Sequence, residues 1–378
     1  MKKLTFLFVV LFIAISGAAA NDYIVLGWND LGMHCSNKDF STTVVLPPFN
    51  VVYAQIIKVG DSLNPPALVS DPFRISYSFP GNTYSVGKTN FWDYSEKLFG
   101  AKLTDNIGLT GAGLSGDMHP MKGFFIVEGV PLTPYTDQDL INEDPFQLAS
   151  LTVYDEKGNS LASTRAVVPV SNEINCVSAG CHASELEILQ NHTDSLGDLT
   201  QATPILCAGC HSSNALGTEG QPGLASLSET IHSRHGEITD DCYKCHPGPK
   251  TKCLRGVMAN EHGLVCQDCH GSVIEVGKSI KEGRQPWLME PSCGAEECHG
   301  TTYAEEQATL YRLSRGHGKL FCSACHGEPH AIAPSRVEND NVQNTTLQGK
   351  AGVLRKCSVC HGYTPAGEGP HGLKAADL

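Results

Sequence analysis

The chain has 378 residues, of which 41% are hydrophobic and 18% are charged. Its formal net charge of −13 argues against the basic surface that nucleic-acid binding requires. The ordinary apolar content, without a heptad repeat, excludes a disordered chain, a collagen and a coiled coil. The unusual feature is a set of 16 Cys and 16 His.

Residues 1–20 are predicted to be a secretory signal peptide. Lys2 and Lys3 precede an apolar run over 4–15, and Ala18 to Ala20 provide a small-residue cleavage site. A membrane-spanning helix needs about 20 apolar residues, so a cleaved signal is favoured over a permanent anchor. We therefore expect the mature protein outside the cytoplasm, in the periplasm or at the cell surface, without a membrane span.

Residues 21–172 are predicted to form an all-β, sandwich-like domain, with a small barrel as the alternative. This region contains most of the aromatic residues and a single cysteine, Cys35. Short β-branched and aromatic runs alternate with Gly, Pro, Asn and Asp breaks, which is typical of antiparallel strands. The expected strands are 23–26, 51–59, 73–79, 123–127, 148–154 and 162–170, the last two joined as a hairpin.

Residues 173–378 are predicted to fold as short helices and irregular loops around large cofactors. The region contains 15 of the 16 Cys and 14 of the 16 His, but only one Trp and one Phe. So few large apolar side chains would not fill an ordinary core. Bound planar cofactors would supply the missing apolar surface.

Seven cysteine motifs in this region predict covalently attached haem c. In the C-x-x-C-H motif both sulfurs form thioethers with haem vinyl groups, and the adjacent His ligates the iron. Five motifs have this form, and two have four residues between the cysteines. The predicted attachment cysteines, from the first to the seventh site in chain order, are Cys176 and Cys181, Cys207 and Cys210, Cys242 and Cys245, Cys266 and Cys269, Cys293 and Cys298, Cys322 and Cys325, and Cys357 and Cys360. The predicted proximal iron ligands are His182, His211, His246, His270, His299, His326 and His361. Zinc sites, redox dithiols and disulfide scaffolds also use paired cysteines, but none of them requires the following His.

Seven further histidines of the same region match the seven irons in number. The predicted distal ligands are His192, His232, His235, His262, His317, His330 and His371. Every haem would then be bis-histidine and six-coordinate; Met, the competing ligand that raises the potential, occurs only twice here. We expect a short helix over 226–235 that presents His232 and His235 on one face to two neighbouring haems. Other helices are expected after Ser184, ending near His192, and over 303–314.

Successive proximal histidines are only 24 to 35 residues apart. Such short segments cannot insulate one macrocycle from the next, so we expect closely packed haems that form an electron relay. The protein would then be an electron carrier, without a catalytic residue, and not an enzyme.

Several residues fall outside the haem motifs. Cys35 and Cys253 are expected either to form a disulfide between the two regions or to be buried free thiols. His34 and His119 are expected to be structural. The acidic residues 137–144 are expected to form a solvated loop and not a Ca²⁺ site, since no EF-hand pattern is present.

The motifs together resemble periplasmic and extracellular multihaem c-type cytochromes of metal-respiring bacteria. The resemblance rests on the seven attachment motifs, including 242–246, on Arg284-Gln285-Pro286-Trp287 and on Gly316-His317-Gly318. Residues 27–35 and 85–92 are similar to the β domain that precedes the haems in some of these proteins. The resemblance implies electron transfer to partner cytochromes, other redox proteins or extracellular metal acceptors. It also leaves open a filament in which His371 ligates a haem of the next subunit.

Two other function classes remain as alternatives. A multihaem reductase of nitrite, hydroxylamine or a sulfur oxyanion would need one haem with an open iron position. A binding or adhesion module would carry haems with a structural role only.

Overall fold

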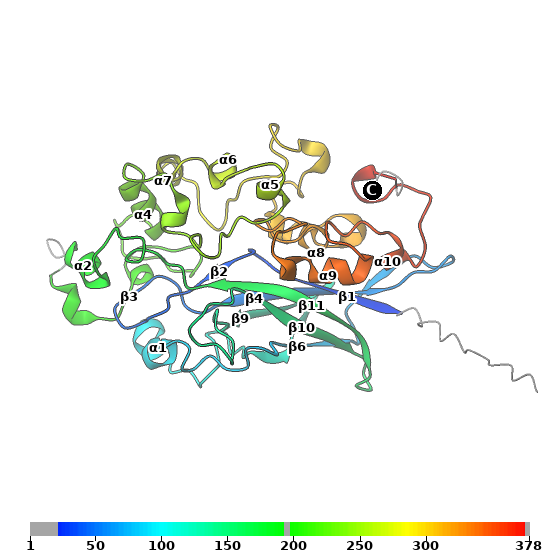
Figure 1. Cartoon of the computed structure of the whole chain (residues 1–378), viewed down its shortest axis with the longest axis horizontal. Helices are drawn as coiled ribbons and strands as arrows, with labels where there is room; N and C mark the ends of the chain where they lie inside the picture. Colours follow the sequence, from blue (N-terminus) through cyan, green and yellow to red (C-terminus); the bar gives the residue numbers. More distant parts are fainter. Residues whose placement is uncertain (1–21, 193–196, 375–378) are drawn as a thin grey trace, which may run out of the picture.

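The computed structural model describes residues 22–192 and 197–374. The predicted signal peptide over 1–20 lies outside the described residues. Figure 1 shows an elongated molecule with β-sheets along one side and short helices along the other. A β-rich N-terminal region followed by short helices and irregular loops is therefore confirmed. None of the helices in the described ranges is long and apolar enough to span a bilayer.

The first sheet contains three of the expected strands. Within the described residues its path is β1 (Tyr23–Asn29), β4 (Asn50–Lys58), β9 (Phe124–Val130) and β8 (His119–Met121), and β5 (Ala67–Val69) also pairs with β4. All of these pairings are antiparallel. The strands expected at 23–26, 51–59 and 123–127 correspond to β1, β4 and β9.

The second sheet contains the expected hairpin. Its strand order is β2 (His34–Cys35), β11 (Ser160–Ser171), β10 (Phe146–Tyr154), β6 (Arg74–Ser78) and β7 (Ser115–Asp117). The turn between β10 and β11 forms because the Asp155 carboxylate accepts the backbone N–H groups of Lys157 and Asn159. Gly158 in this turn has a φ of 82°, which favours glycine over other residues.

The two sheets share one apolar core. Val25 of β1 and Val52 of β4 belong to the same buried cluster as Leu151 of β10 and Val168 of β11. Along β10 buried residues alternate with half-buried ones, as expected when one sheet face points into a core. Residues of both sheets therefore contribute to one buried apolar cluster.

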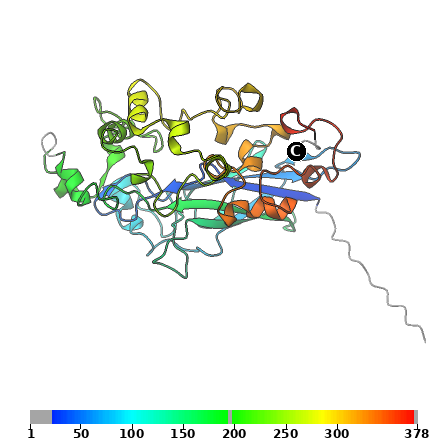
Figure 2. The same cartoon turned by 45° about the horizontal axis from the view of Figure 1, so that its top comes forward.

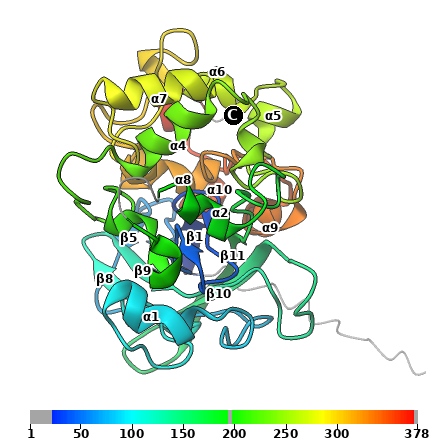
Figure 3. The ribbon, with the colours of Figure 1, turned by 90° about the vertical axis from the view of Figure 1, so that its left-hand side faces the viewer.

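The first sheet is also buried on its opposite face, against the C-terminal region. Trp28 of β1 and Tyr53 of β4 stack with ring centres 5.8 Å apart. Phe321, which directly precedes the sixth attachment site, packs on Trp28 at 5.3 Å and on Tyr53 at 5.9 Å. This second contact explains why nearly all of β4 is buried, whereas β10 shows alternation. Figure 3 shows the resulting layers end-on.

One helix of the N-terminal region was not expected from the sequence. Helix α1 (Phe91–Phe99) buries Phe91 and Leu98 next to Phe40. It ends at Gly100, which adopts the left-handed conformation with a φ of 69°. Near this helix, the short strands β3 (Thr43–Val44) and β12 (Ile205–Leu206) pair in parallel and join the two regions.

The C-terminal region consists of short helices. The α-helices are α2 (Glu185–Gln190), α4 (Leu227–His235), α5 (Val257–Asn260), α6 (Cys266–His270), α7 (Val273–Lys281), α8 (Cys322–His326), α9 (Glu338–Gln348) and α10 (Ser358–His361). The 3-10 helices are η1 (Leu199–Ala202), η2 (Cys207–Gly209), η3 (Cys242–Lys244), η4 (Thr301–Tyr303), η5 (Tyr311–Leu313), η6 (His317–Lys319) and η7 (Pro370–Gly372). The expected helices at 226–235 and after Ser184 are α4 and α2, whose N-caps Ser226 and Ser184 each accept a backbone N–H with the side chain.

The prediction of a helix over 303–314 is wrong. This segment contains only the end of η4 and the short η5. Ala304 and Leu310 are extended, and Ala308 has a φ of 57°, so the helix hydrogen bonds cannot continue through the segment. Tyr311 instead points inward and donates its hydroxyl to the Gly327 carbonyl at 2.8 Å.

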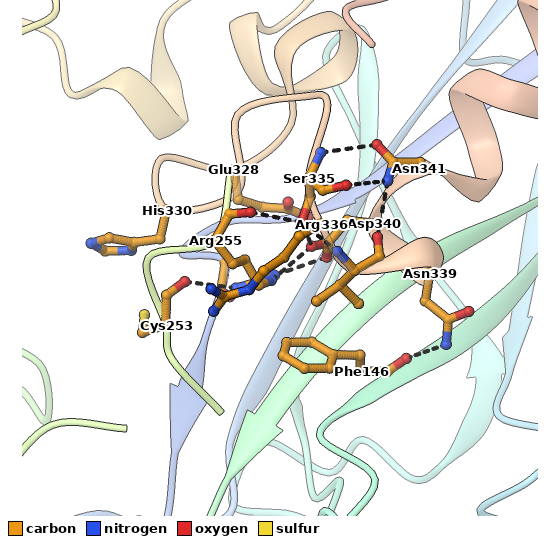
Figure 4. A network of polar contacts seen from close by, with 12 residues as sticks. Phe146, Cys253, Arg255, Glu328, His330, Ser335, Arg336, Asn339, Asp340 and Asn341 are labelled. Atoms are coloured by element: carbon orange, nitrogen blue, oxygen red, sulfur yellow. Dashed lines mark hydrogen bonds and ion pairs between the residues drawn. The ribbon is translucent and has the colours of Figure 1, made fainter. Parts of the chain in front are cut away.

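A buried polar network fastens the C-terminal region to the sheets (Figure 4). Arg255 donates to both carboxylate oxygens of Asp340, at 2.7 and 2.9 Å, and to the Gly32 carbonyl at 2.7 Å. The Arg255 guanidinium also lies over the Phe146 ring of β10, 4.7 Å from its centre. Glu328 accepts the backbone N–H of Asn29 at the end of β1. The network therefore ties three separate segments of the C-terminal region to two strands.

Candidate functional site

The attachment motifs share one backbone geometry. In the second, third and seventh sites the backbone N–H of the His donates to the carbonyl of the first Cys, at 2.9–3.0 Å. This single helical turn brings both cysteines and the His to one side of the chain. In the two longer motifs His182 donates to the Cys176 carbonyl at 3.2 Å, and His299 to the Cys293 carbonyl at 3.3 Å. The longer motifs therefore close on the same hydrogen bond with a wider loop.

Six pairs of histidine rings lie at nearly constant separation. The pairs, with the distances between ring centres, are His182–His235 (6.1 Å), His192–His211 (6.4 Å), His232–His246 (6.0 Å), His270–His330 (6.3 Å), His317–His361 (6.1 Å) and His326–His371 (5.9 Å). Each pair joins one histidine of an attachment motif to one histidine outside the motifs. Two imidazoles that bind one metal at about 2.0–2.1 Å per nitrogen would have ring centres about 6.3 Å apart.

Ordinary aromatic contacts also fall between about 4.5 and 7 Å, so separation alone does not identify a metal site. The composition of the pairs is the stronger observation. Histidines packed together for apolar reasons would also form pairs within a class, motif with motif. All six histidine–histidine ring contacts within the described ranges instead cross between the two classes.

Backbone hydrogen bonds fix the orientation of several rings. On α4 the Nδ1 atoms of His232 and His235 donate to the carbonyls of Ser228 and Ile231, both at 2.7 Å. His192, just after α2, makes the same contact with Ile188 at 2.8 Å. A carbonyl only accepts, so Nδ1 carries the proton and Nε2 carries the lone pair. Metal-ligating histidines usually have such a backbone partner.

Two more paired histidines are oriented by distant carbonyls. His211 donates Nδ1 to the Ala225 carbonyl at 2.9 Å, and His330 donates Nδ1 to the Leu31 carbonyl at 3.2 Å. The His330 contact comes from the loop after β1, so the N-terminal region orients a ring of the C-terminal region. The contact with a carbonyl places a proton on the Nδ1 atom of each ring.

Burial keeps several of the paired rings neutral. Burial, together with the charge of nearby His232, lowers the pKa of His246 to about 4. Burial and the charge of His330 lower the pKa of His270 to about 4. Burial and the charge of His371 do the same for His326, whose pKa is also about 4. These imidazoles therefore present a lone pair at neutral pH.

The two remaining predicted ligands, His262 and His299, do not contact each other in the structure. His262, which follows α5, and His299 of the fifth site are both exposed. Within the described ranges neither ring contacts another histidine ring. His371, in contrast, packs against His326 of its own chain and also contacts Tyr303 at 5.5 Å.

The donor arrangement does not favour the zinc and disulfide alternatives. A structural zinc site needs about four Cys or His ligands in a tetrahedron. The described residues include no group of three or more Cys, His, Asp or Glu side chains arranged to hold a metal ion. All sixteen cysteines are free thiols. Cys35 and Cys253 are both partly buried and are not joined by a disulfide in this structure.

Cys253 lies against His330. The charge of the Cys253 thiolate is the main reason why the pKa of His330 is raised, to about 9. Burial acts to raise the pKa of Cys253, but the charge of His330, a hydrogen bond with it and the charge of Arg255 together outweigh burial and lower that pKa. Burial raises the pKa of Cys35, and the charge of Cys253 adds to this shift. Cys35, Cys253 and His330 thus form one cluster at the boundary between the two regions. The sequence did not predict this cluster, because the three residues are far apart along the chain.

The remaining candidates have structural partners. His34 is buried, and its Nε2 lies 2.7 Å from a carboxylate oxygen of Asp30. His119 lies in the exposed strand β8. In the acidic loop, Asp137 forms an ion pair with the buried Lys88 at 2.6 Å. The contact with Asp30 agrees with a structural role for His34.

Comparison with known proteins adds no further assignment. No protein-family model, no curated protein and no solved structure matches this chain.

Proposed function

We propose that this protein is a secreted electron-transfer protein that carries seven covalently attached c-type haems. The observation that carries the proposal is the set of six histidine pairs, each with one motif and one non-motif ring at 5.9–6.4 Å. The paired cysteines of each site would form the thioethers, and the adjacent His would be the proximal ligand. The second ring of each pair would be the distal ligand.

The composition of the C-terminal region supports bound macrocycles. Its buried apolar side chains in the described residues are few, and four of the nine are alanines: Leu189, Ala208, Ile280, Tyr311, Phe321, Ala324, Ala331, Ala333 and Leu354. The two sheets, by comparison, share a core of twenty buried apolar residues. A region of about 200 residues with so little buried apolar surface is marginal unless a cofactor contributes to its interior. We therefore propose that this half requires its haems to fold.

The ligand set supports electron transfer over catalysis. Two histidines per iron leave no open coordination position and favour low potentials. The Nδ1 hydrogen bonds would orient the histidine rings, and the sheets of the N-terminal region would exclude water. The haems would supply the one-electron chemistry. The partners would be redox proteins or metal acceptors outside the cytoplasm. The two sheets would pack as a sandwich and serve for docking or assembly.

A reductase with one open haem is the second candidate. It is favoured by one observation, the exposed His299 of the fifth site, whose ring contacts no other histidine within the described ranges. An iron ligated by His299 alone would have an open position for a small oxyanion. If His262 reaches this iron in the holoprotein, the site is closed and the carrier function holds.

Low-temperature electron paramagnetic resonance (EPR) of the oxidised holoprotein tests the two candidates. We expect only low-spin ferric signals from the wild type and a high-spin signal from one haem in the His262→Ala variant. The matched control, His119→Ala, changes an exposed histidine outside the pairs and should leave the spectrum unchanged. A high-spin signal already present in the wild type and unaffected by His262→Ala would favour the reductase.

A further inference from the structure

We propose that the order of the haem sites in space differs from their order along the chain. The first site (Cys176, Cys181 and His182) lies between the second (Cys207 to His211) and the third (Cys242 to His246). The second site then forms one end of the relay, and the seventh forms the other. This inference rests on the proposed function, since only bound haems make the order of the sites an electron path.

Helix α4 places the first and third sites side by side. His235 pairs with His182 of the first site, and His232 pairs with His246 of the third site. The two α4 histidines are three residues apart, so their Cβ atoms lie about 5–6 Å apart on one face. The ligands of the first and third irons are therefore neighbours on a single helical turn.

The second site lies toward the α2 end of the molecule. Its His211 pairs with His192, directly after α2. Figures 1 and 2 show α2 at one end of the long axis of the molecule, with α4 further inward. The Glu185 carboxylate of α2 accepts the backbone N–H of Thr43 in β3 at 3.0 Å, which fastens this end to the N-terminal region.

Helix α2 links the first site to the second. His182 of the first site lies just before α2, and His192, which pairs with His211 of the second site, lies just after it. The first site is therefore linked to the second through α2 and to the third through α4.

Contacts from the third site onward agree with the order of the chain. The Gln267 side chain of the fourth site donates to the carbonyl of Asp240, just before the third site, at 2.6 Å. Tyr303, which follows the fifth site, contacts the ring of His371, which pairs with His326 of the sixth site.

The seventh site closes the series at the opposite end. The Cys325 carbonyl of the sixth site accepts the backbone N–H of Leu354, which precedes the seventh site, at 2.9 Å. The Cys360 carbonyl accepts the backbone N–H of Gly60, just beyond the end of β4. In Figure 1, α10 lies at the end of the molecule opposite α2. A partner that docks at the α2 end would therefore exchange electrons with the second site.

Two matched variants distinguish the two possible orders. Cys176→Ala with Cys181→Ala removes the first haem, and Cys207→Ala with Cys210→Ala removes the second. Each variant should carry six haems by intact mass. Loss of the first haem should leave the second haem isolated, so that one of the six ferric centres shows an EPR signal without spin coupling to neighbours. Loss of the second haem should leave no isolated centre.

The opposite pattern, with an isolated centre only after loss of the second haem, would establish the chain order and overturn the proposal. An isolated centre in neither variant would mean that the first three haems contact one another, which also overturns it. A wild-type mass without haem would instead contradict the proposed function.

If either cysteine variant fails to mature, ligand exchange gives the same information with all haems retained. Met raises the potential of a haem, so the haem of the first site in His235→Met, or of the second in His192→Met, can be reduced alone and made diamagnetic. Two neighbouring signals should change in His235→Met and one in His192→Met. The reverse pattern would contradict the proposed order.

Discussion

Replacing Arg255 should destabilise the holoprotein far more than replacing an exposed arginine. The Arg255 and Asp340 side chains are 0% and 2% exposed. Arg255→Met removes two charge-assisted hydrogen bonds from the Asp340 carboxylate and leaves its charge buried, with Ser335 as a remaining neutral donor. Each such bond contributes about 1.5–3 kcal/mol, and breaking a buried ion pair costs about 3–5 kcal/mol. We expect a loss of about 3–5 kcal/mol in the free energy of unfolding.

Guanidinium unfolding followed by far-ultraviolet circular dichroism measures this loss. The matched control is Arg74→Met, because the Arg74–Asp117 pair joins two strands with side chains that are 49% and 55% exposed. Its loss should cost at most about 1 kcal/mol. The double variant Arg255→Met with Asp340→Leu should recover much of the stability, since it removes both members of the buried ion pair.

The reasoning would be refuted if Arg255→Met cost no more than Arg74→Met. Arg255 and Gly256 also donate their backbone N–H groups to the His330 carbonyl, at 2.8 and 3.1 Å. A small cost would therefore mean that this network does not hold the C-terminal region, with its paired His330, against the sheets.

Two further predictions concern the histidine pairs and the N-terminal region. His232→Ala should convert one haem to a high-spin ferric form in the EPR spectrum, because it removes the proposed distal ligand of that haem. The control His119→Ala should leave the spectrum unchanged. An unchanged spectrum of His232→Ala would contradict the pairing of His232 with His246. Asp137→Asn should cost about 1.5–3 kcal/mol at neutral pH, because the buried Lys88 ammonium loses its charged partner. Burial acts to raise the pKa of Asp137, but hydrogen bonds from Lys88 and Thr83 outweigh it and lower that pKa. This contribution is therefore complete at neutral pH and is lost as the pH falls below about 4, so the difference between wild type and variant in chemical unfolding should shrink in acid.

Much of the fold could be predicted where local signals agree with long-range packing. The hairpin of β10 and β11 follows from two β-branched runs around an Asp155-to-Asn159 turn. Helix α4 follows from its Ser226 cap and its histidine spacing. Helix α1 was not expected, because its apolar face is defined by contacts with distant residues such as Phe40. The segment 303–314 has a helical composition but does not form a helix, and its Tyr311 side chain donates a hydrogen bond to the distant Gly327 carbonyl.

The motif residues of the candidate site could be read from the sequence because haem attachment needs a fixed local spacing. The partner of each motif histidine could not, because it depends on tertiary structure. The contact between His330 and His270 depends on the hydrogen bond that orients His330 on the loop after β1. The contact between His371 and His326 depends on the path of the irregular C-terminal segment. The count of seven spare histidines therefore predicted the ligand set without predicting the pairs.

The mass of the intact, purified holoprotein under denaturing conditions tests the central proposal most directly. Addition of a thiol across a vinyl group loses no atoms, so each attachment site adds the full mass of one haem. We expect the mass of the chain from Asn21 plus seven haems, with the colour retained after extraction with acidified solvent. A colourless protein with the mass of the polypeptide alone would contradict the proposed function.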